Sequence, residues 1–118
     1  MLAHAKTRAR RHNSGRADLS RRCEAHKQWI RGRECAFVDA GGCRGHIQAA
    51  HVRLRTDGGA GLKPSDVYCW PSCEGHHGEQ HQIGEPAFAA KYRVDLVDLA
   101  TAYAKSSPHW FRLREMLP

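Results

Sequence analysis

The stretch CEGHHGEQH, residues 73 to 81, places one cysteine and three histidines within nine residues. Thiolate and imidazole groups are the ligands that zinc and other transition metals prefer. On a helix, His77 and His81 lie about 40° apart around the axis, whereas His76 lies about 100° from His77. The spacing therefore predicts two sites, one at Cys73 with His76 and one at His77 with His81.

The first pair supplies half of a tetrahedral zinc site, which has four protein ligands when its role is structural. Cys35 and Cys43, which bracket CAFVDAGGC, can supply the other half. We expect Cys35, Cys43, Cys73 and His76 to hold a structural Zn²⁺, although the spacing from Cys35 to Cys43 is longer than in a zinc ribbon. Two further cysteines compete as ligands: Cys69 and, more distantly, Cys23.

The second pair leaves positions on a bound metal open for water and a phosphate oxygen, as in catalytic centres. We expect a catalytic divalent cation there, Mg²⁺, Mn²⁺, Ni²⁺ or Zn²⁺. A hydrolytic reaction also needs a general base, and His51 is the best candidate in the chain. In an extended strand Arg53 and Arg55 would share the face of His51, so that both could contact phosphate.

The surrounding sequence predicts the elements that position these residues. Residues 20–31 have the composition of a basic helix that begins at Ser20 and ends at Gly32. A knuckle and a β-hairpin should follow, and residues 67–70 should form a strand. Residues 73–81 should form the first part of a helix. Helices between 85 and 117 should complete the core, with Asp95 as a cap and a stripe at 96, 99, 100 and 103.

The length of 118 residues predicts one domain, 20–118, and the net charge of +7 is concentrated at the N-terminus. Residues 1–33 hold ten Lys and Arg against two acidic residues, while the remainder holds nine against ten. We interpret residues 1–19, with Arg8, Arg10 and Arg11, as a flexible basic arm that contacts a polyanion. A solubilising tail is the alternative.

The chain has no run of 18 apolar residues and no apolar signal-peptide segment, which predicts a cytoplasmic protein that does not contact membranes. Five cysteines, an odd number, lie among histidines at the spacings of metal ligands. This pattern favours metal binding in a reducing compartment over a set of disulfides.

Two cysteines are followed, in order, by the segments AAHVR, GAGLKPSD, CxxHHxxxH and GEPAF. These ordered segments resemble the HNH (His-Me finger) endonuclease superfamily. They are more closely similar to a family of small phage and prophage HNH nucleases related to the phage recombination-enhancement nucleases. The resemblance covers about residues 26–108. It implies an α+β fold with a ββα-metal core at about 33–83 and a zinc knuckle, flanked by the basic helix and the C-terminal helices at 85–117.

The resemblance implies that His51 is the general base and that Asp66 takes the middle position of the motif, usually asparagine. His77 and His81 match the catalytic metal ligands, and Cys35, Cys43, Cys73 and His76 match the structural zinc ligands. Ala50 departs from the pattern, because the position before the base often supplies a metal ligand. Asp66 could therefore orient His51 or bind the metal, and both interpretations stay open.

These observations predict a metal-dependent DNA endonuclease that acts in phage or prophage recombination or DNA processing in the bacterial or infected host cell. The expected partner is DNA, single-stranded and recombinase-coated forms included. The candidate DNA contacts are Arg53, Arg55, Lys63, Arg8, Arg10 and Arg11. The alternative is a zinc-stabilised DNA-binding or recombination accessory module without catalysis.

Overall fold

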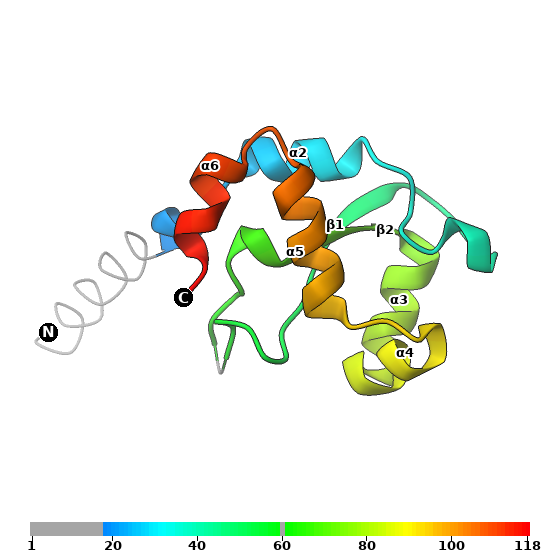
Figure 1. Ribbon diagram of the computed structural model, residues 1–118. Coiled ribbons are helices and arrows are strands. Elements are labelled where there is room, and N and C mark those ends of the chain that lie inside the picture. Colours follow the sequence, from blue (N-terminus) through cyan, green and yellow to red (C-terminus); the bar gives the residue numbers. More distant parts are fainter. Residues whose placement is uncertain (1–17, 60) are drawn as a thin grey trace, which may run out of the picture.

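The computed structural model describes residues 18–59 and 61–118. Arg8, Arg10 and Arg11 of the predicted arm lie outside this part of the chain. The helices and strands follow the order α2 (Glu24–Arg31), β1 (Ile47–His51), β2 (Cys69–Cys73), α3 (Glu74–Ile83), α4 (Glu85–Tyr92), α5 (Leu96–Ser106) and α6 (Trp110–Leu113) (Figure 1). Short 3-10 turns cover Val38–Ala40, Asp66–Tyr68 and Arg114–Met116.

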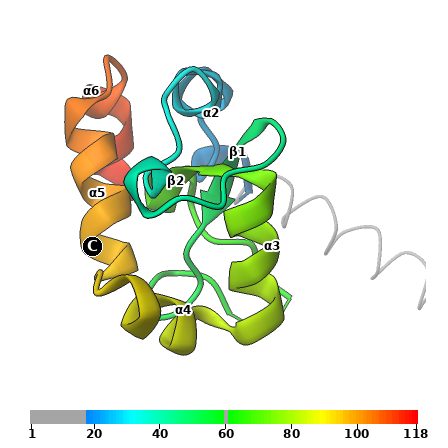
Figure 2. The same ribbon diagram turned by 90° about the vertical axis from the view of Figure 1, so that its right-hand side faces the viewer.

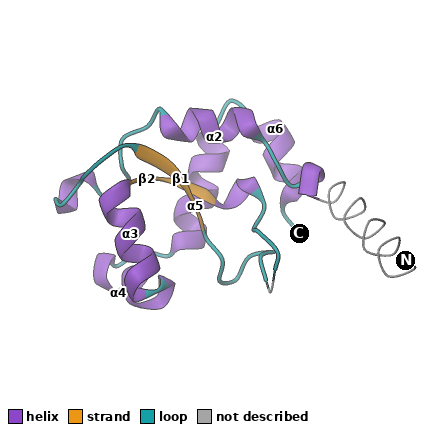
Figure 3. Cartoon of the chain, turned by 180° about the vertical axis from the view of Figure 1, so that it is seen from behind, coloured by secondary structure: helices purple, strands orange, loops and turns teal. Residues whose placement is uncertain are grey.

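The centre of the fold is an antiparallel hairpin followed directly by a helix. β1 pairs with β2 in a register that sets Ile47 opposite Cys73 and His51 opposite Cys69. All five residues of β2 are buried, and α3 begins at the residue after the strand. Helices surround this two-stranded sheet (Figure 3), so the predicted α+β class is confirmed.

Aromatic side chains and the C-terminal helices form the core around the hairpin. Figure 2 shows α3 and α5 on opposite sides of the two strands. Phe37, Trp70 and Phe88 contact one another, with ring centroids 5.2 to 5.8 Å apart. The predicted stripe of α5 faces this core, since Leu96 and Ala100 are buried. As expected, Asp95 caps that helix by accepting the backbone N–H of Asp98 at 3.0 Å.

The basic helix α2 begins later than predicted. It starts at Glu24 rather than at Ser20, and it ends at Gly32 as expected. The late start has a physical cause, because Asp66 binds the backbone in front of the helix. The N–H of Asp66 donates to the carbonyl of Arg21 at 2.9 Å, and the N–H of Cys23 donates to Oδ2 of Asp66 at 2.7 Å.

The two strands also differ from the predicted ones. Of residues 67–70, expected as a strand, 67 and 68 belong to the 3-10 turn Asp66–Tyr68, and β2 covers Cys69–Cys73. β1 ends at His51, because Glu85 of α4 accepts the N–H groups of Arg53 and Leu54 at 2.7 and 2.9 Å. Arg55 has a left-handed backbone, with φ of 61°. The prediction that His51, Arg53 and Arg55 share one strand face was therefore wrong.

Over 18–59 and 61–118, no helix combines the length and the apolar character that are needed to span a membrane.

The burial of His26 of α2 leads us to expect that the folded protein is less stable at acid pH. The His26 side chain is fully buried, Nδ1 lies 3.0 Å from the hydroxyl of Ser107, and Nε2 has no hydrogen-bond partner among the residues that the structure describes. Burial lowers the pKa of His26 to about 4. Between pH 6.5 and 4 the unfolded chain therefore binds more protons than the folded one, and the free energy of unfolding should fall by about 2 to 3 kcal/mol as the pH drops.

Urea unfolding of the wild type and of His26→Gln at pH 7 and pH 4.5 measures this effect. The wild type should lose about 2 kcal/mol more than the variant on acidification, because glutamine does not titrate. The other titrating groups are common to both proteins and cancel in the difference. Equal losses in the two proteins would contradict the assignment.

Candidate functional site

Four of the predicted zinc ligands come together between the knuckle, the end of β2 and the first turn of α3. The ligand atoms of Cys35, Cys43, Cys73 and His76 all lie within 4.8 Å of one another. Nδ1 of His76 is 3.1 Å from the sulfur of Cys73, 3.4 Å from that of Cys35 and 3.7 Å from that of Cys43. Three sulfurs and one imidazole are a typical zinc donor set, so this cluster could bind a metal such as zinc.

The electrostatics of the cluster fit a cation. Burial raises the pKa of Cys73, but hydrogen bonds from the backbone N–H groups of His76 and Arg44 outweigh it and bring the pKa to about 6. Desolvation, followed by interactions with Cys73 and Cys35, raises the pKa of Cys43 to about 12. The neighbouring cysteines thus oppose ionisation of Cys43, and a divalent cation would favour its thiolate form. Neither competing ligand, Cys69 or Cys23, belongs to the cluster.

His51 and Asp66 form the second arrangement of functional interest. Nε2 of His51, the last residue of β1, lies 2.9 Å from Oδ1 of Asp66, whose side chain is fully buried. Burial raises the pKa of Asp66, but hydrogen bonds from His51, the N–H of Cys23 and Arg22 outweigh it and hold the pKa well below its usual range. An ionised carboxylate only accepts, so Nε2 of His51 carries the proton, and in the neutral ring Nδ1 then presents a lone pair.

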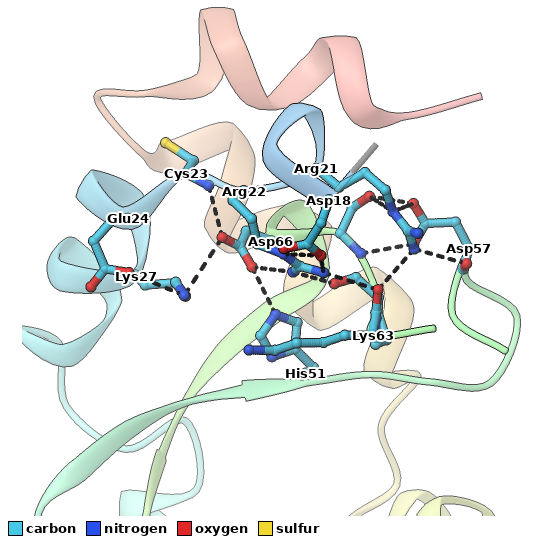
Figure 4. Close-up of polar contacts among 12 residues, drawn as sticks. Asp18, Arg21, Arg22, Cys23, Glu24, Lys27, His51, Asp57, Lys63 and Asp66 are labelled. Atoms are coloured by element: carbon cyan, nitrogen blue, oxygen red, sulfur yellow. Dashed lines mark hydrogen bonds and ion pairs between the residues drawn. The ribbon is translucent and has the colours of Figure 1, made fainter. Parts of the chain in front are cut away.

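Both oxygens of Asp66 are engaged by protein groups (Figure 4). Oδ1 contacts His51 and Nη1 of Arg22, the latter at 2.8 Å. Oδ2 accepts the N–H of Cys23 at 2.7 Å, with Nζ of Lys27 at 3.8 Å. The sulfur of Cys69 lies within 4.8 Å of donor atoms of His51 and Asp66, but burial raises its pKa strongly and keeps it protonated. These contacts leave Asp66 no oxygen without a partner.

His77 and His81 project from successive turns of α3, as their spacing predicts. Their Nε2 atoms are 3.0 Å apart, and Nδ1 of His77 lies 2.6 Å from Oε1 of Gln48 on β1. The amide oxygen accepts from Nδ1, so Nε2 of His77 carries a lone pair. Burial, followed by the nearby charges of His81 and His51, lowers the pKa of His77 and favours the neutral ring.

Two imidazole nitrogens that point at each other in this way can hold one divalent cation. Within the part of the chain that the structure describes, no third histidine, cysteine or carboxylate completes a metal cluster with His77 and His81. The remaining coordination positions would therefore fall to water or to a ligand. The separation of His76 from His77, predicted from helical geometry, is confirmed by their different partners.

One cavity of about 810 Å³ brings the histidines together with basic side chains. Its lining includes His51, His77 and His81 and, among others, the cationic residues Lys27, Arg31, Arg53 and Lys63. Arg53 and Lys63 make no ion pair with any acidic side chain in residues 18–59 and 61–118. Arg55 is absent from the lining and instead pairs with Asp95 at 2.6 Å.

Sequence reasoning missed three residues that act on these histidines. Gln48 binds His77, Arg22 binds Asp66, and Glu85 binds the backbone after His51. Strand alternation puts Gln48 on the opposite face from His51, so the sequence pattern did not indicate that Gln48 belongs to the site. Arg22 lies 44 residues before Asp66, in a segment whose many arginines looked alike in sequence.

Comparison with protein-family models finds no matching family, and no curated protein or solved structure matches the chain. The functional assignment therefore depends on the geometry of the cleft and on the motifs in the sequence.

Proposed function

We propose that this protein is a metal-dependent DNA endonuclease of the HNH (His-Me finger) type. The observation that carries the proposal is the content of one cleft. It combines a histidine with an available Nδ1, a pair of imidazole nitrogens suited to a cation, and two basic side chains, Arg53 and Lys63, that make no ion pair within the described residues. The order hairpin then helix, with His51 on the first strand and His77 and His81 on the helix, supports a ββα-metal core.

In the proposed reaction, Nδ1 of His51 accepts a proton from a water molecule as the water oxygen attacks the scissile phosphorus. The bond from phosphorus to the 3′ oxygen breaks, which leaves a 5′-phosphate and a 3′-hydroxyl. A divalent cation held by His77 and His81 would supply charge stabilisation at the leaving oxygen. Arg53 and Lys63 would hold the flanking phosphates, because neither makes an ion pair with a carboxylate in residues 18–59 and 61–118.

Asp66 acts in this proposal as the residue that orients His51. Its ionised carboxylate fixes the proton on Nε2 and so keeps the lone pair on Nδ1. The alternative role as a metal ligand is less well supported, because both of its oxygens have protein partners. Ala50 contributes no ligand, so phosphate and water would complete the metal coordination.

The Cys35, Cys43, Cys73 and His76 cluster takes the structural role, with zinc as its metal. It joins the knuckle to β2 and α3 and so fixes the helix that carries His77 and His81. The proposed setting is DNA processing during phage or prophage recombination in the cytoplasm of a bacterial host. Single-stranded and recombinase-coated DNA are the proposed substrates beside duplex DNA.

Manganese binding tests the second metal site without an activity assay. Zinc-loaded wild type should bind one Mn²⁺, and His81→Ala should weaken that binding by about 10- to 100-fold, because one of only two protein ligands is lost. The signal of free Mn²⁺ in electron paramagnetic resonance measures the bound fraction. The matched control is His46→Ala, since His46 is an exposed histidine outside the cleft.

A zinc-stabilised DNA-binding or accessory module without catalysis is the second candidate. One observation favours it, which is that His77 and His81 have no third protein ligand among residues 18–59 and 61–118. That candidate predicts one tightly held zinc and equal, weak manganese binding in the wild type, His81→Ala and His46→Ala.

A further inference from the structure

We propose that Arg22 is a positioning residue for His51, acting through the carboxylate of Asp66. Arg22 holds Oδ1 of Asp66 in the place where it accepts the Nε2 proton of His51. The inference deepens the proposed nuclease function and rests on it. Arg22 itself would not touch the DNA at the point of cleavage or the reacting atoms.

The guanidinium of Arg22 is fixed on both of its edges (Figure 4). Nη1 donates to Oδ1 of Asp66 at 2.8 Å and to the carbonyl of Pro64 at 2.7 Å, and Nη2 donates to the carbonyl of Lys63 at 3.1 Å. Nε donates to Oδ1 of Asp18 at 2.9 Å. A planar guanidinium with partners on every side has little freedom to rotate, so it defines the position of the carboxylate oxygen that it binds.

The two oxygens of Asp66 are held by different groups, and Arg22 is the cationic side chain that contacts the same oxygen as His51. Oδ2 has the N–H of Cys23 and the ammonium of Lys27. Among the residues that the structure describes, the side chains that contact Oδ1 are Arg22 and His51. Without Arg22, Oδ1 would be held directly by His51 alone, and otherwise only through the planar carboxylate by the contacts of Oδ2 with Cys23 and Lys27. The acceptor of the Nε2 proton would then be less firmly placed, and the tautomer with a free Nδ1 would be less well defined.

Arg21 offers a matched control one residue away. Its side chain donates to the carbonyls of Asp57 and Lys63 at 3.0 and 2.8 Å and to the hydroxyl of Ser65 at 3.2 Å. Arg21 thus anchors the same loop, but its side chain does not contact the carboxylate of Asp66. Arg22→Gln and Arg21→Gln remove the same charge from nearly the same place, so electrostatic effects on DNA affinity are matched.

The first test compares cleavage kinetics of these two variants at saturating metal. Arg22→Gln should lower kcat by about 10- to 100-fold relative to Arg21→Gln, with KM and DNA affinity equal in the two proteins. Arg22→Lys should recover part of kcat, because it keeps the charge but cannot fix two edges at once. Equal kcat values for Arg22→Gln and Arg21→Gln would overturn the proposal.

An Asp66→Ala background keeps the test decisive if Arg22→Gln folds poorly. Alanine removes both the acceptor oxygen and the buried charge, so the double variant is spared the cost of an unpaired carboxylate. If Arg22 acts through the carboxylate, Arg22→Gln should change kcat by less than about threefold in this background. A full 10- to 100-fold further loss would overturn the route through Asp66.

A spectroscopic readout separates this proposal from the nuclease function. Nitrogen NMR of the His51 ring should show the Nε2-protonated tautomer in the wild type and in Arg21→Gln, and a mixture of tautomers in Arg22→Gln. Absence of cleavage by the wild type with any metal would refute the nuclease function alone. The NMR comparison would then decide on Arg22, and an unchanged tautomer in Arg22→Gln would overturn the positioning role.

Discussion

Replacing His51 by alanine should lower the single-turnover rate of DNA cleavage by about 100-fold or more, which is the usual contribution of a general base. The proposed role explains the size of this loss, because Nδ1 is the proposed proton acceptor and the other histidines of the cleft, His77 and His81, are assigned to the metal. Asp66 is buried behind the ring with both oxygens engaged. DNA affinity should change by less than about twofold, since the cationic side chains of the cleft remain.

Labelled oligonucleotide cleavage measures the rate, and fluorescence anisotropy without metal measures affinity. His46→Ala is again the matched control and should cleave at the wild-type rate. Arg53→Gln should show the opposite pattern, with weakened binding that depends less on salt. If His51→Ala cleaved as fast as the wild type, the assignment of the general base would be wrong.

Loss of the Cys/His cluster is expected to have the largest effect on stability. Cys43→Ser should release the zinc and lower the free energy of unfolding by about 5 kcal/mol or more, because structural zinc sites contribute about 10 to 16 kcal/mol of binding free energy. Cys43 is exposed, so the serine hydroxyl itself adds no cost of burial. The structural loss would follow from the missing ligand alone.

Cys69→Ser is the control for this experiment. Cys69 is fully buried but lies outside the cluster, so the variant should keep one zinc per chain even if the buried hydroxyl lowers its stability. Zinc content by atomic absorption, with thermal unfolding before and after chelation, gives both quantities. A zinc-free Cys69→Ser, or a Cys43→Ser that retains zinc and wild-type stability, would contradict the ligand set.

Helical periodicity explains why the sequence predicted the two groups of histidines. His76 must leave α3 in a different direction from His77 and His81, whatever the remainder of the fold does. Helix caps are also determined by local sequence, so Asp95 and Gly32 lie at helix ends as the sequence predicted. Ligand chemistry required two donors beside Cys73 and His76, and the sequence favoured Cys35 and Cys43 while leaving Cys69 and Cys23 as competitors that the fold excludes.

Contacts between distant segments could not be predicted in this way. Alternation placed Arg53 and Arg55 beside His51, but Glu85 captures the backbone N–H groups that would continue the strand. The early start predicted for α2 failed for the same reason, since Asp66 binds the backbone before Glu24. In both places, hydrogen bonds from the backbone to a distant carboxylate override the local preference for strand or helix.

The most direct test of the central claim is nicking of supercoiled plasmid by zinc-loaded wild type with added Mg²⁺, Mn²⁺ or Ni²⁺, followed by treatment with DNA ligase. A metal-dependent nick that ligase reseals would show the predicted 5′-phosphate and 3′-hydroxyl ends. Plasmid that stays supercoiled with every metal, while the protein still binds DNA, would contradict the account and favour the zinc-stabilised binding module.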